Sequence, residues 1–173
     1  MNEVAYEYGK KTLVAETAYA NTPNDSDFFK NIGTDGVLNY PLTEQGQANL
    51  LVDVVDVATN EIHNCMGVFY WEGTWITVGK NSWEENSAKW EKYGSGWASS
   101  YAGGYDPNDA GKWYGGCAVE NQAFFDASGK ARESLKIFAL VKNGNIVERG
   151  DVAISDIYAS LPQTVRSALL DMT

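Results

Sequence analysis

Hydrophobic and polar positions divide this chain into two short apolar runs, one amphipathic segment between them, and two long polar or aromatic stretches. The apolar runs are residues 11–16 (KTLVAE) and 65–71 (CMGVFYW), short enough to predict β-strands. Residues 43–59 have the 3.6-residue periodicity of a helix, with Thr43 as the N-cap. Its apolar face is formed by Leu51, Val54, Val55 and Ala58.

Helical segments are also predicted at both ends of this pattern. Residues 2–9 have the character of the last turns of a helix that ends at Gly9. Another short helix is predicted from about Ser134, after a turn at residues 126–129. The order strand, loop, helix, strand, loop, helix predicts an α/β fold with parallel strands, because a helix separates two mostly apolar strands.

The two long loops, residues 17–41 and 72–117, follow the C-terminal ends of the predicted strands. In barrels and in open α/β sheets this edge binds ligands. Glu16 ends the first strand, and Trp71 and Glu72 end the second. These three residues are therefore expected near one another on the ligand-binding face.

Two parallel strands with two helices leave strand edges unpaired and apolar faces uncovered. The pattern therefore predicts part of a larger unit. Residues 146–173 change in character, and SLPQTV within them indicates a linker or the start of a following module.

The composition narrows the classes of function. The 173 residues fit one domain, and the net charge of −10 comes without any cluster of Lys and Arg, which argues against nucleic acid and anionic membranes. No apolar run approaches a membrane span, and the first residues lack the apolar core of a signal peptide.

The single histidine, His63, argues against a histidine relay or a multi-histidine zinc site. Cys65 and Cys117 are read as two separate thiols, with a disulfide left open.

The aromatic residues are unevenly distributed. All six tryptophans lie between residues 71 and 113, in a stretch rich in glycine and serine. Core aromatic residues would be spread through the chain at helix or strand spacing. Their concentration in a loop therefore favours a surface platform for a ligand.

Five ordered segments carry a resemblance to a known family: LVAETAY, NYPLTEQGQANLL, GVFYWEGTW, EKYGSGWASSYAGGYDPNDAGKWYGG and AVENQAFFDASGKARESL. Together they resemble the C-terminal portion of glycoside hydrolase family 53, the arabinogalactan endo-β-1,4-galactanases, from about residue 2 to 141. The resemblance implies an incomplete (β/α)8 TIM barrel. Residues 1–145 would hold strands seven and eight with their helices, and the first six units would lie outside this chain.

The resemblance also implies roles for individual residues. The family retains anomeric configuration with two glutamates, and Glu16 matches the nucleophile, whereas the acid/base matches no position here. Glu72 would line the sugar site, and the substrate would stack on Trp71, Trp75 and, further away, Trp97. The other three tryptophans, Trp83, Trp90 and Trp113, would pack the loop against itself.

Residues 24–31 (NDSDFFKN) begin like an EF-hand loop, but Lys30 stands at the turn glycine and Gly36 at the bidentate glutamate. Bacterial members of the family instead hold a calcium ion between the loops after strands seven and eight. By this resemblance its ligands would be Asp25, Asn31 and Glu120, with the carbonyl groups of Phe29 and Cys117. Glu120 replaces an aspartate of the family pattern, and oxygen ligands with two carboxylates suit calcium better than zinc.

Three functions follow as alternatives. The first is part of a retaining endo-β-1,4-galactanase, inactive alone because the acid/base lies elsewhere, which would need the missing barrel half or other copies of itself. The second is a carbohydrate-binding remnant without hydrolysis. The third is an inert fragment that self-assembles. The resemblance implies an extracellular parent enzyme acting on galactan or arabinogalactan.

Overall fold

The computed structural model describes residues 1–36, 38–93, 100–104, 107–108, 110–112, 114 and 116–142. Its helices are α1 (Asn2–Tyr8), α2 (Glu44–Asp56), α3 (Trp83–Tyr93) and α4 (Ile137–Lys142), and its strands are β1 (Thr12–Thr17) and β2 (Cys65–Tyr70). A π-helical turn (Val57–Glu61) extends α2, and 3-10 turns occupy Ser100–Gly104, Glu120–Gln122 and Glu133–Lys136. The predicted strands and the helices at residues 2–9 and 43–59 are thus confirmed, with small shifts of their ends.

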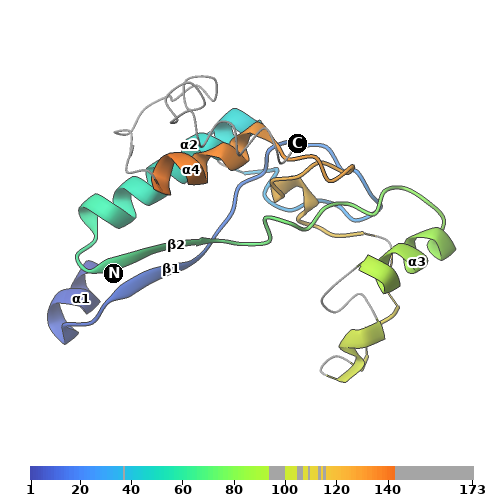
Figure 1. The fold of residues 1–173 in the computed structure, drawn as a ribbon, viewed down its shortest axis with the longest axis horizontal. Helices are drawn as coiled ribbons and strands as arrows, with labels where there is room; N and C mark the ends of the chain where they lie inside the picture. Colours follow the sequence, from blue (N-terminus) through green and yellow to red (C-terminus); the bar gives the residue numbers. More distant parts are fainter. Residues whose placement is uncertain are drawn as a thin grey trace.

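Strands β1 and β2 form a two-stranded parallel sheet, as the sequence predicts (Figure 1). Thr12 pairs with Cys65 and Thr17 with Tyr70, with irregular register between them. The Trp71 amide donates a 2.8 Å hydrogen bond to the Thr17 carbonyl, which continues the pairing past the end of β2. Both loops therefore leave the sheet at one edge.

The core lies where α2 and α4 run side by side over the end of the sheet (Figure 1). Its buried residues are Leu51, Val52, Phe124, Ile137 and Leu140. Each large apolar side chain buried there stabilises the fold by roughly 1.5–3 kcal/mol. Thr43 caps α2 as predicted, because its Oγ1 accepts a 3.1 Å hydrogen bond from the Gly46 amide.

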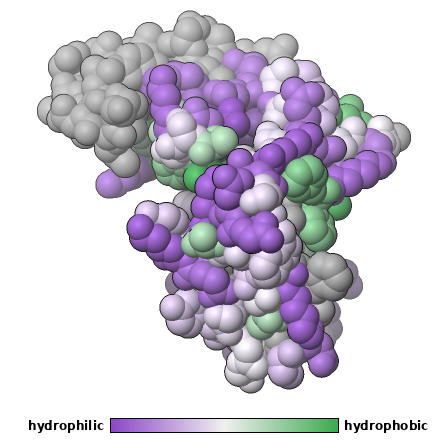
Figure 2. Space-filling view, turned by 90° about the vertical axis from the view of Figure 1, so that its right-hand side faces the viewer, coloured by the Kyte–Doolittle hydropathy of each residue, from purple (hydrophilic) through white to green (hydrophobic). Residues whose placement is uncertain are grey.

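The sheet keeps apolar side chains exposed, including Leu13, Met66 and Phe69. Hydrophobic residues also reach the surface among hydrophilic ones in Figure 2. Two strands with few covering elements cannot bury both faces of a sheet. This exposure is consistent with the expectation that the chain is part of a larger unit.

One prediction is wrong. The stretch 72–117 was predicted to be loop throughout, but it contains α3 and the 3-10 turn at Ser100–Gly104. Helix α3 begins with a capping box, in which Ser82 Oγ accepts from the Glu85 amide at 3.2 Å and Glu85 Oε2 accepts from the Ser82 amide at 3.0 Å. The sequence carries this signal as Ser-x-x-Glu, but the density of aromatic residues obscures it.

The structure also bears on the expectations about the two cysteines, a membrane span and the C-terminal tail. Cys65 and Cys117 are both free thiols, so the reading of two separate cysteines is confirmed. Within the described ranges, no helix is long and apolar enough to cross a membrane. The tail at residues 146–173, together with Trp97 and Trp113, lies outside the described residues, so the proposed domain boundary stays a prediction.

Candidate active site

Glu16 and Glu72 lie at the shared C-terminal edge of the two strands. Glu16 is exposed near the end of β1, and Glu72 is half-buried two residues after β2. Their carboxyl groups are close enough for the charge on Glu16 to disfavour the charge on Glu72. The sheet thus brings together two carboxyl groups that are 56 positions apart in the sequence (72 − 16).

Glu72 has an unusual backbone and an unusual carboxyl environment. Its φ of 59° is left-handed, a conformation that costs energy for residues other than glycine, and its carbonyl accepts a 3.1 Å hydrogen bond from the Trp75 amide. Burial, and secondly the charge on Glu16, raise the pKa of the Glu72 carboxyl to about 7. Its buried Oε2 finds no hydrogen-bond partner in the described part of the chain. At neutral pH this carboxyl can therefore carry a proton.

The two tryptophans beside Glu72 differ in environment. Trp71 is 47% exposed, so its ring is free to contact a ligand. Trp75 is half-buried and packs against a second cluster that contains Trp90, Tyr114 and Cys117. Burial raises the pKa of the Cys117 thiol to about 11, so this thiol stays neutral.

The end of β2 is held in place by a buried polar network that the sequence did not reveal. Gln47 is fully buried, and its Nε2 lies 2.9 Å from Tyr70 Oη, 2.9 Å from the Gln122 carbonyl and 3.0 Å from the Tyr19 carbonyl. The Tyr70 hydroxyl accepts from the Tyr19 amide at 3.1 Å and donates to the Gln122 carbonyl at 2.8 Å. These bonds tie α2, the loop after β1 and the turn at residues 120–122 to the strand end that precedes Trp71 and Glu72.

The two loops after the strands meet at a second polar cluster. The Ile32 amide donates to the Ala118 carbonyl at 2.9 Å. Asp27 is 2% exposed and accepts hydrogen bonds from the amides of Phe29 at 2.9 Å and Cys117 at 3.0 Å. Burial raises the pKa of the Asp27 carboxyl, and these hydrogen bonds oppose that rise. Asp27 belongs to the EF-hand-like start of residues 24–31, which the sequence argues against, and it is not among the calcium ligands that the family resemblance implies.

Glycine at position 116 makes this junction possible. Gly116 has a φ of 140°, and a Cβ there would lie 2.0 Å from the Asp27 Cγ. A larger residue would force the two loops apart. The contact therefore depends on both the backbone conformation and the absence of a side chain.

The predicted metal ligands Asn31 and Glu120 are brought together at this cluster. Asn31 Nδ2 donates to Glu120 Oε1 at 3.0 Å, and the Asn31 amide donates to Asp25 Oδ1 at 2.7 Å. Asn31 Oδ1 and Glu120 Oε2 are buried, and neither has a hydrogen-bond partner among the described residues. Burial is also the main cause that raises the pKa of the Glu120 carboxyl.

Two unpartnered buried acceptors with a nearby carboxylate fit a hard cation such as calcium. The described residues contain no group of three or more His, Cys, Asp or Glu side chains arranged for a metal ion. A site here would therefore rely on the Asn31 amide and on backbone carbonyls as well as on carboxylates.

The comparisons with known proteins decide the family. The model of glycosyl hydrolase family 53 matches residues 1–138, which is most of the chain. The chain belongs to glycosyl hydrolase family 53. This family 53 chain is 49% identical, over 152 residues, to an endo-beta-1,4-galactanase of Bacillus subtilis (strain 168), a match that covers 86% of the chain and 35% of the relative.

A solved structure agrees with this assignment. The GH53 catalytic domain of Ignisphaera aggregans is 35% identical, with a TM-score of 0.58, and the match covers 81% of this chain and 32% of that one. The family 53 chain thus spans about a third of the length of each relative. Membership places the chain in a family whose catalytic domain is a TIM barrel. The α/β elements described above amount to a small part of such a barrel.

Proposed function

We propose that this chain is the nucleophile-bearing part of a retaining endo-β-1,4-galactanase that hydrolyses β-1,4-galactosidic bonds in arabinogalactan or pectic galactan. The observation that carries the proposal is the exposed carboxylate of Glu16 at the C-terminal strand edge, beside Trp71 and Glu72, in a chain 49% identical to the Bacillus subtilis enzyme. In TIM barrels this edge holds the active site.

In the proposed reaction, Glu16 attacks the anomeric carbon of a galactosyl unit while an acid protonates the departing glycosidic oxygen. Water then attacks the sugar that is bound to Glu16, and the group that first acted as the acid now acts as the base and takes a proton from this water. Retaining enzymes hold the two carboxyl groups about 5–5.5 Å apart. Glu72 is not this second group by resemblance, so the acid/base is supplied from outside these residues and the chain alone is inactive.

Trp71, Glu72 and Trp75 form the sugar site in this proposal. The exposed face of Trp71 stacks on the CH-rich face of a galactose ring, as aromatic rings do with apolar surfaces. The Oε2 of Glu72 is buried and unpartnered, and in this proposal it gains a partner when a sugar hydroxyl binds against the strand end. Trp97, proposed as a more distant platform, lies outside the described residues.

A calcium ion is the proposed structural cofactor at the junction of the two loops. Asp25, Asn31 and Glu120 would hold it, with the carbonyl groups of Phe29 and Cys117, and the two orphaned acceptors support the proposal. Asp27 is close by and accepts from the Cys117 amide. The ion would supply stability to the loops and no step of the hydrolysis.

The proposed units are the seventh and eighth of the barrel, and the proposed partner is the remaining barrel units or another copy of the chain. Exposed Leu13, Met66 and Phe69 on the sheet support this proposal, because barrel closure would cover them.

A polymeric galactan substrate also supports an extracellular location for the whole enzyme. A carbohydrate-binding role without hydrolysis is the second candidate, favoured by the exposed ring of Trp71.

Complementation tests the proposal. The 173-residue chain is assayed on β-1,4-galactan by reducing-end detection, alone and mixed with a separately produced segment of the Bacillus subtilis relative that precedes the matched region. We expect no activity from the chain alone and activity from the mixture. Glu16→Ala should abolish that activity, whereas Glu7→Ala, an exposed glutamate on α1, should leave it unchanged.

The opposite results are equally informative. Glu16-dependent hydrolysis by the chain alone would contradict the external acid/base and make Glu72 the first candidate for it. Binding of galactan by the mixture without any hydrolysis would favour the binding role.

A further inference from the structure

The exits of β1 and β2 are joined by a backbone hydrogen bond directly beside the two glutamates. Glu16 precedes Thr17, and Glu72 follows Trp71. The Trp71 amide donates to the Thr17 carbonyl at 2.8 Å, so this bond lies between the two residues that carry the carboxyl groups. The strand pairing before it is irregular between Val14 and Thr17. The placement of one glutamate relative to the other therefore depends on attachments beyond the regular pairing.

The Tyr70 hydroxyl provides such an attachment. It accepts a hydrogen bond from the Tyr19 amide at 3.1 Å and another from Gln47 Nε2 at 2.9 Å. It donates its own proton to the Gln122 carbonyl at 2.8 Å. One donated and two accepted hydrogen bonds use the full capacity of a hydroxyl group. This oxygen is therefore occupied by protein partners from three other segments.

The backbone of Tyr19 is the part of the exit of β1 that these bonds fix. Its amide donates to Tyr70 at the end of β2, and its carbonyl accepts from Gln47 Nε2 on α2 at 3.0 Å. Tyr19 lies three positions after Glu16 (19 − 16). The chain that follows the proposed nucleophile is thus bonded through both of its backbone polar groups to β2 and α2.

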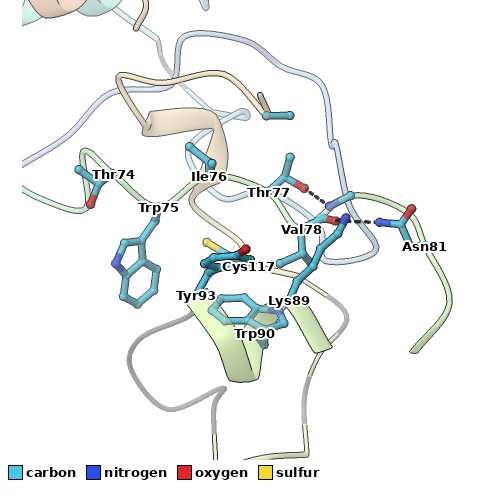
Figure 3. A pocket seen from close by; sticks show the side chains of 12 residues that line it. Thr74, Trp75, Ile76, Thr77, Val78, Asn81, Lys89, Trp90, Tyr93 and Cys117 are labelled. Carbon is cyan, nitrogen blue, oxygen red and sulfur yellow. Dashed lines mark hydrogen bonds between the residues drawn. The ribbon is translucent and has the colours of Figure 1, made fainter. Parts of the chain in front are cut away.

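The turn that carries Glu72 also depends on Tyr70. Glu72 has a left-handed φ of 59°, and the Phe124 amide donates to the Gly73 carbonyl at 2.8 Å. The ring of Phe124 lies 4.2 Å from the ring of Tyr70, measured between centroids. Residues 74–79, which follow this turn, border a cavity of about 490 Å³ between themselves and α3 (Figure 3). Because open space adjoins that segment, the contacts with Tyr70 and Phe124 determine where the turn lies.

We propose that Tyr70 is a positioning residue for the proposed hydrolysis: it fixes the backbone after Glu16 relative to the turn that carries Glu72. The inference rests on the proposed galactanase function, in which Glu16 attacks the anomeric carbon. Tyr70 acts through the placement of the two carboxyl groups, since its own hydroxyl is fully engaged with protein partners. A displacement of about 1 Å in reacting groups can cost about 10²-fold in rate, so this placement affects turnover.

Two variants separate positioning from general stability. Tyr70→Phe removes the hydroxyl and keeps the ring that packs on Phe124. Its matched control is Tyr40→Phe, because Tyr40 lies in the loop after β1 and its hydroxyl donates to Asp53 on α2. The control thus loses a tyrosine hydrogen bond between the same loop and helix, while the bonds of Tyr70 remain. Urea unfolding gives the loss of stability in each variant.

The first measurement needs no hydrolysis. Carbon-13 NMR follows the carboxyl groups of the 173-residue chain through a pH titration, with Glu16 present and with Glu16→Gln. In the wild-type background, Glu16→Gln should lower the pKa of Glu72, because the charge on Glu16 is the second cause of its rise. In Tyr70→Phe this lowering should be smaller, because Glu16 is no longer held near Glu72 and the interaction of charges weakens with distance. In Tyr40→Phe it should equal the wild-type value.

The second measurement is hydrogen exchange at the Tyr19 amide. In the wild-type chain this amide should be protected by its bond to Tyr70. We expect its exchange to become about tenfold faster in Tyr70→Phe, the effect of one lost hydrogen bond, and to stay unchanged in Tyr40→Phe.

The third measurement uses the complemented mixture on β-1,4-galactan. Tyr70→Phe should lower kcat about tenfold and change KM by less than about twofold, because positioning of the reacting groups matters in the transition state more than in substrate binding. Tyr40→Phe should leave both constants unchanged.

Several results would overturn the inference. They are an unprotected Tyr19 amide in the wild-type chain, equal effects of Glu16→Gln on the pKa of Glu72 in wild type and in Tyr70→Phe, and a raised KM with unchanged kcat. Equal effects of Tyr40→Phe and Tyr70→Phe would show a general loss of stability and would also overturn it. The exchange measurement on wild type decides the matter even if Tyr70→Phe does not fold.

Failure of the proposed function gives a different pattern. A wild-type mixture that never hydrolyses galactan would reject that function, whereas the titration and the amide exchange would still show whether Tyr70 holds Glu16 near Glu72. Hydrolysis that depends on Glu16 but is unchanged in Tyr70→Phe would reject this inference alone.

Discussion

Replacing Glu72 with glutamine removes a carboxyl group whose pKa is raised to about 7, by burial first and by the charge on Glu16 second. The ordinary value for this group is 4.5, which is the value expected in the unfolded chain. Between these two pH values the folded protein keeps a proton that the unfolded chain releases. Stability therefore falls as pH rises from about 4.5 to about 7, and the cost is complete above that range.

The size of this effect follows from the two pKa values. Without solvent screening, the rise of the pKa from 4.5 to about 7 would correspond to about 3 kcal/mol. Glu72 is half-buried, so solvent screens its charge and reduces the cost to about 1 kcal/mol. The Glu72→Gln variant keeps the shape and avoids the charge, so it should be more stable than wild type by about 1 kcal/mol at pH 8 and equal to it at pH 4.

The assay is urea unfolding of wild type and Glu72→Gln at several pH values from 4 to 8. Other buried carboxyl groups with raised pKa values, Asp27 and Glu120, also contribute to the pH dependence, so the difference between the two proteins is the quantity of interest. Glu16→Gln is the matched control, because it removes the second cause and leaves the burial of Glu72. In Glu16→Gln we expect burial alone to keep the pKa of Glu72 raised, but by less than in wild type. Stability should therefore still fall as pH rises, over a narrower pH range.

Two results would refute this reasoning. Equal pH dependence in wild type and Glu72→Gln would mean that Glu72 is not buried enough to hold its proton. Complete loss of the effect in Glu16→Gln would mean that the neighbouring charge, and not burial, is the main cause.

Three further outcomes are expected. Gly46→Ala should destabilise the fold by about 2 kcal/mol in urea unfolding, because the added Cβ would lie 1.8 Å from the Pro41 carbonyl oxygen. Gln47→Leu should cost about 3 kcal/mol by the same measurement, since it leaves the partners of a fully buried amide unsatisfied; an effect below about 1 kcal/mol would contradict the role of this network. Calcium should raise the melting temperature relative to chelator, and Asn31→Ala should remove that difference; no shift in wild type, with no metal by elemental analysis, would reject the site.

Local sequence patterns determined most of the regular structure. The strands at 12–17 and 65–70 follow from short apolar runs, and α2 follows from its periodicity and from the Thr43 cap. These features depend on neighbours within one or two turns, so they can be predicted without knowing the fold. Helix α3 was also encoded locally, in its Ser82 and Glu85 capping box, although the aromatic content favoured a loop.

The place of Glu16 and Glu72 at one sheet edge could also be predicted, because parallel strands bring their C-terminal ends together. The properties of the two carboxyl groups could not. Both are glutamates at strand ends, yet only Glu72 turns through a left-handed conformation and buries an oxygen. Burial depends on which distant segments cover a group, and no local pattern records that.

The tertiary structure alone decided the contacts between segments far apart in the chain. The meeting of Asp27 with the Cys117 amide, 90 positions away, and of Gln47 with Gln122, 75 positions away, came from the packing of loops onto the strand ends. The cavity beside Trp90 likewise exists only because α3 folds back toward residues 74–79. Hydrogen bonds and cavities of this kind depend on positions in space, which the sequence specifies only through the whole set of packing interactions.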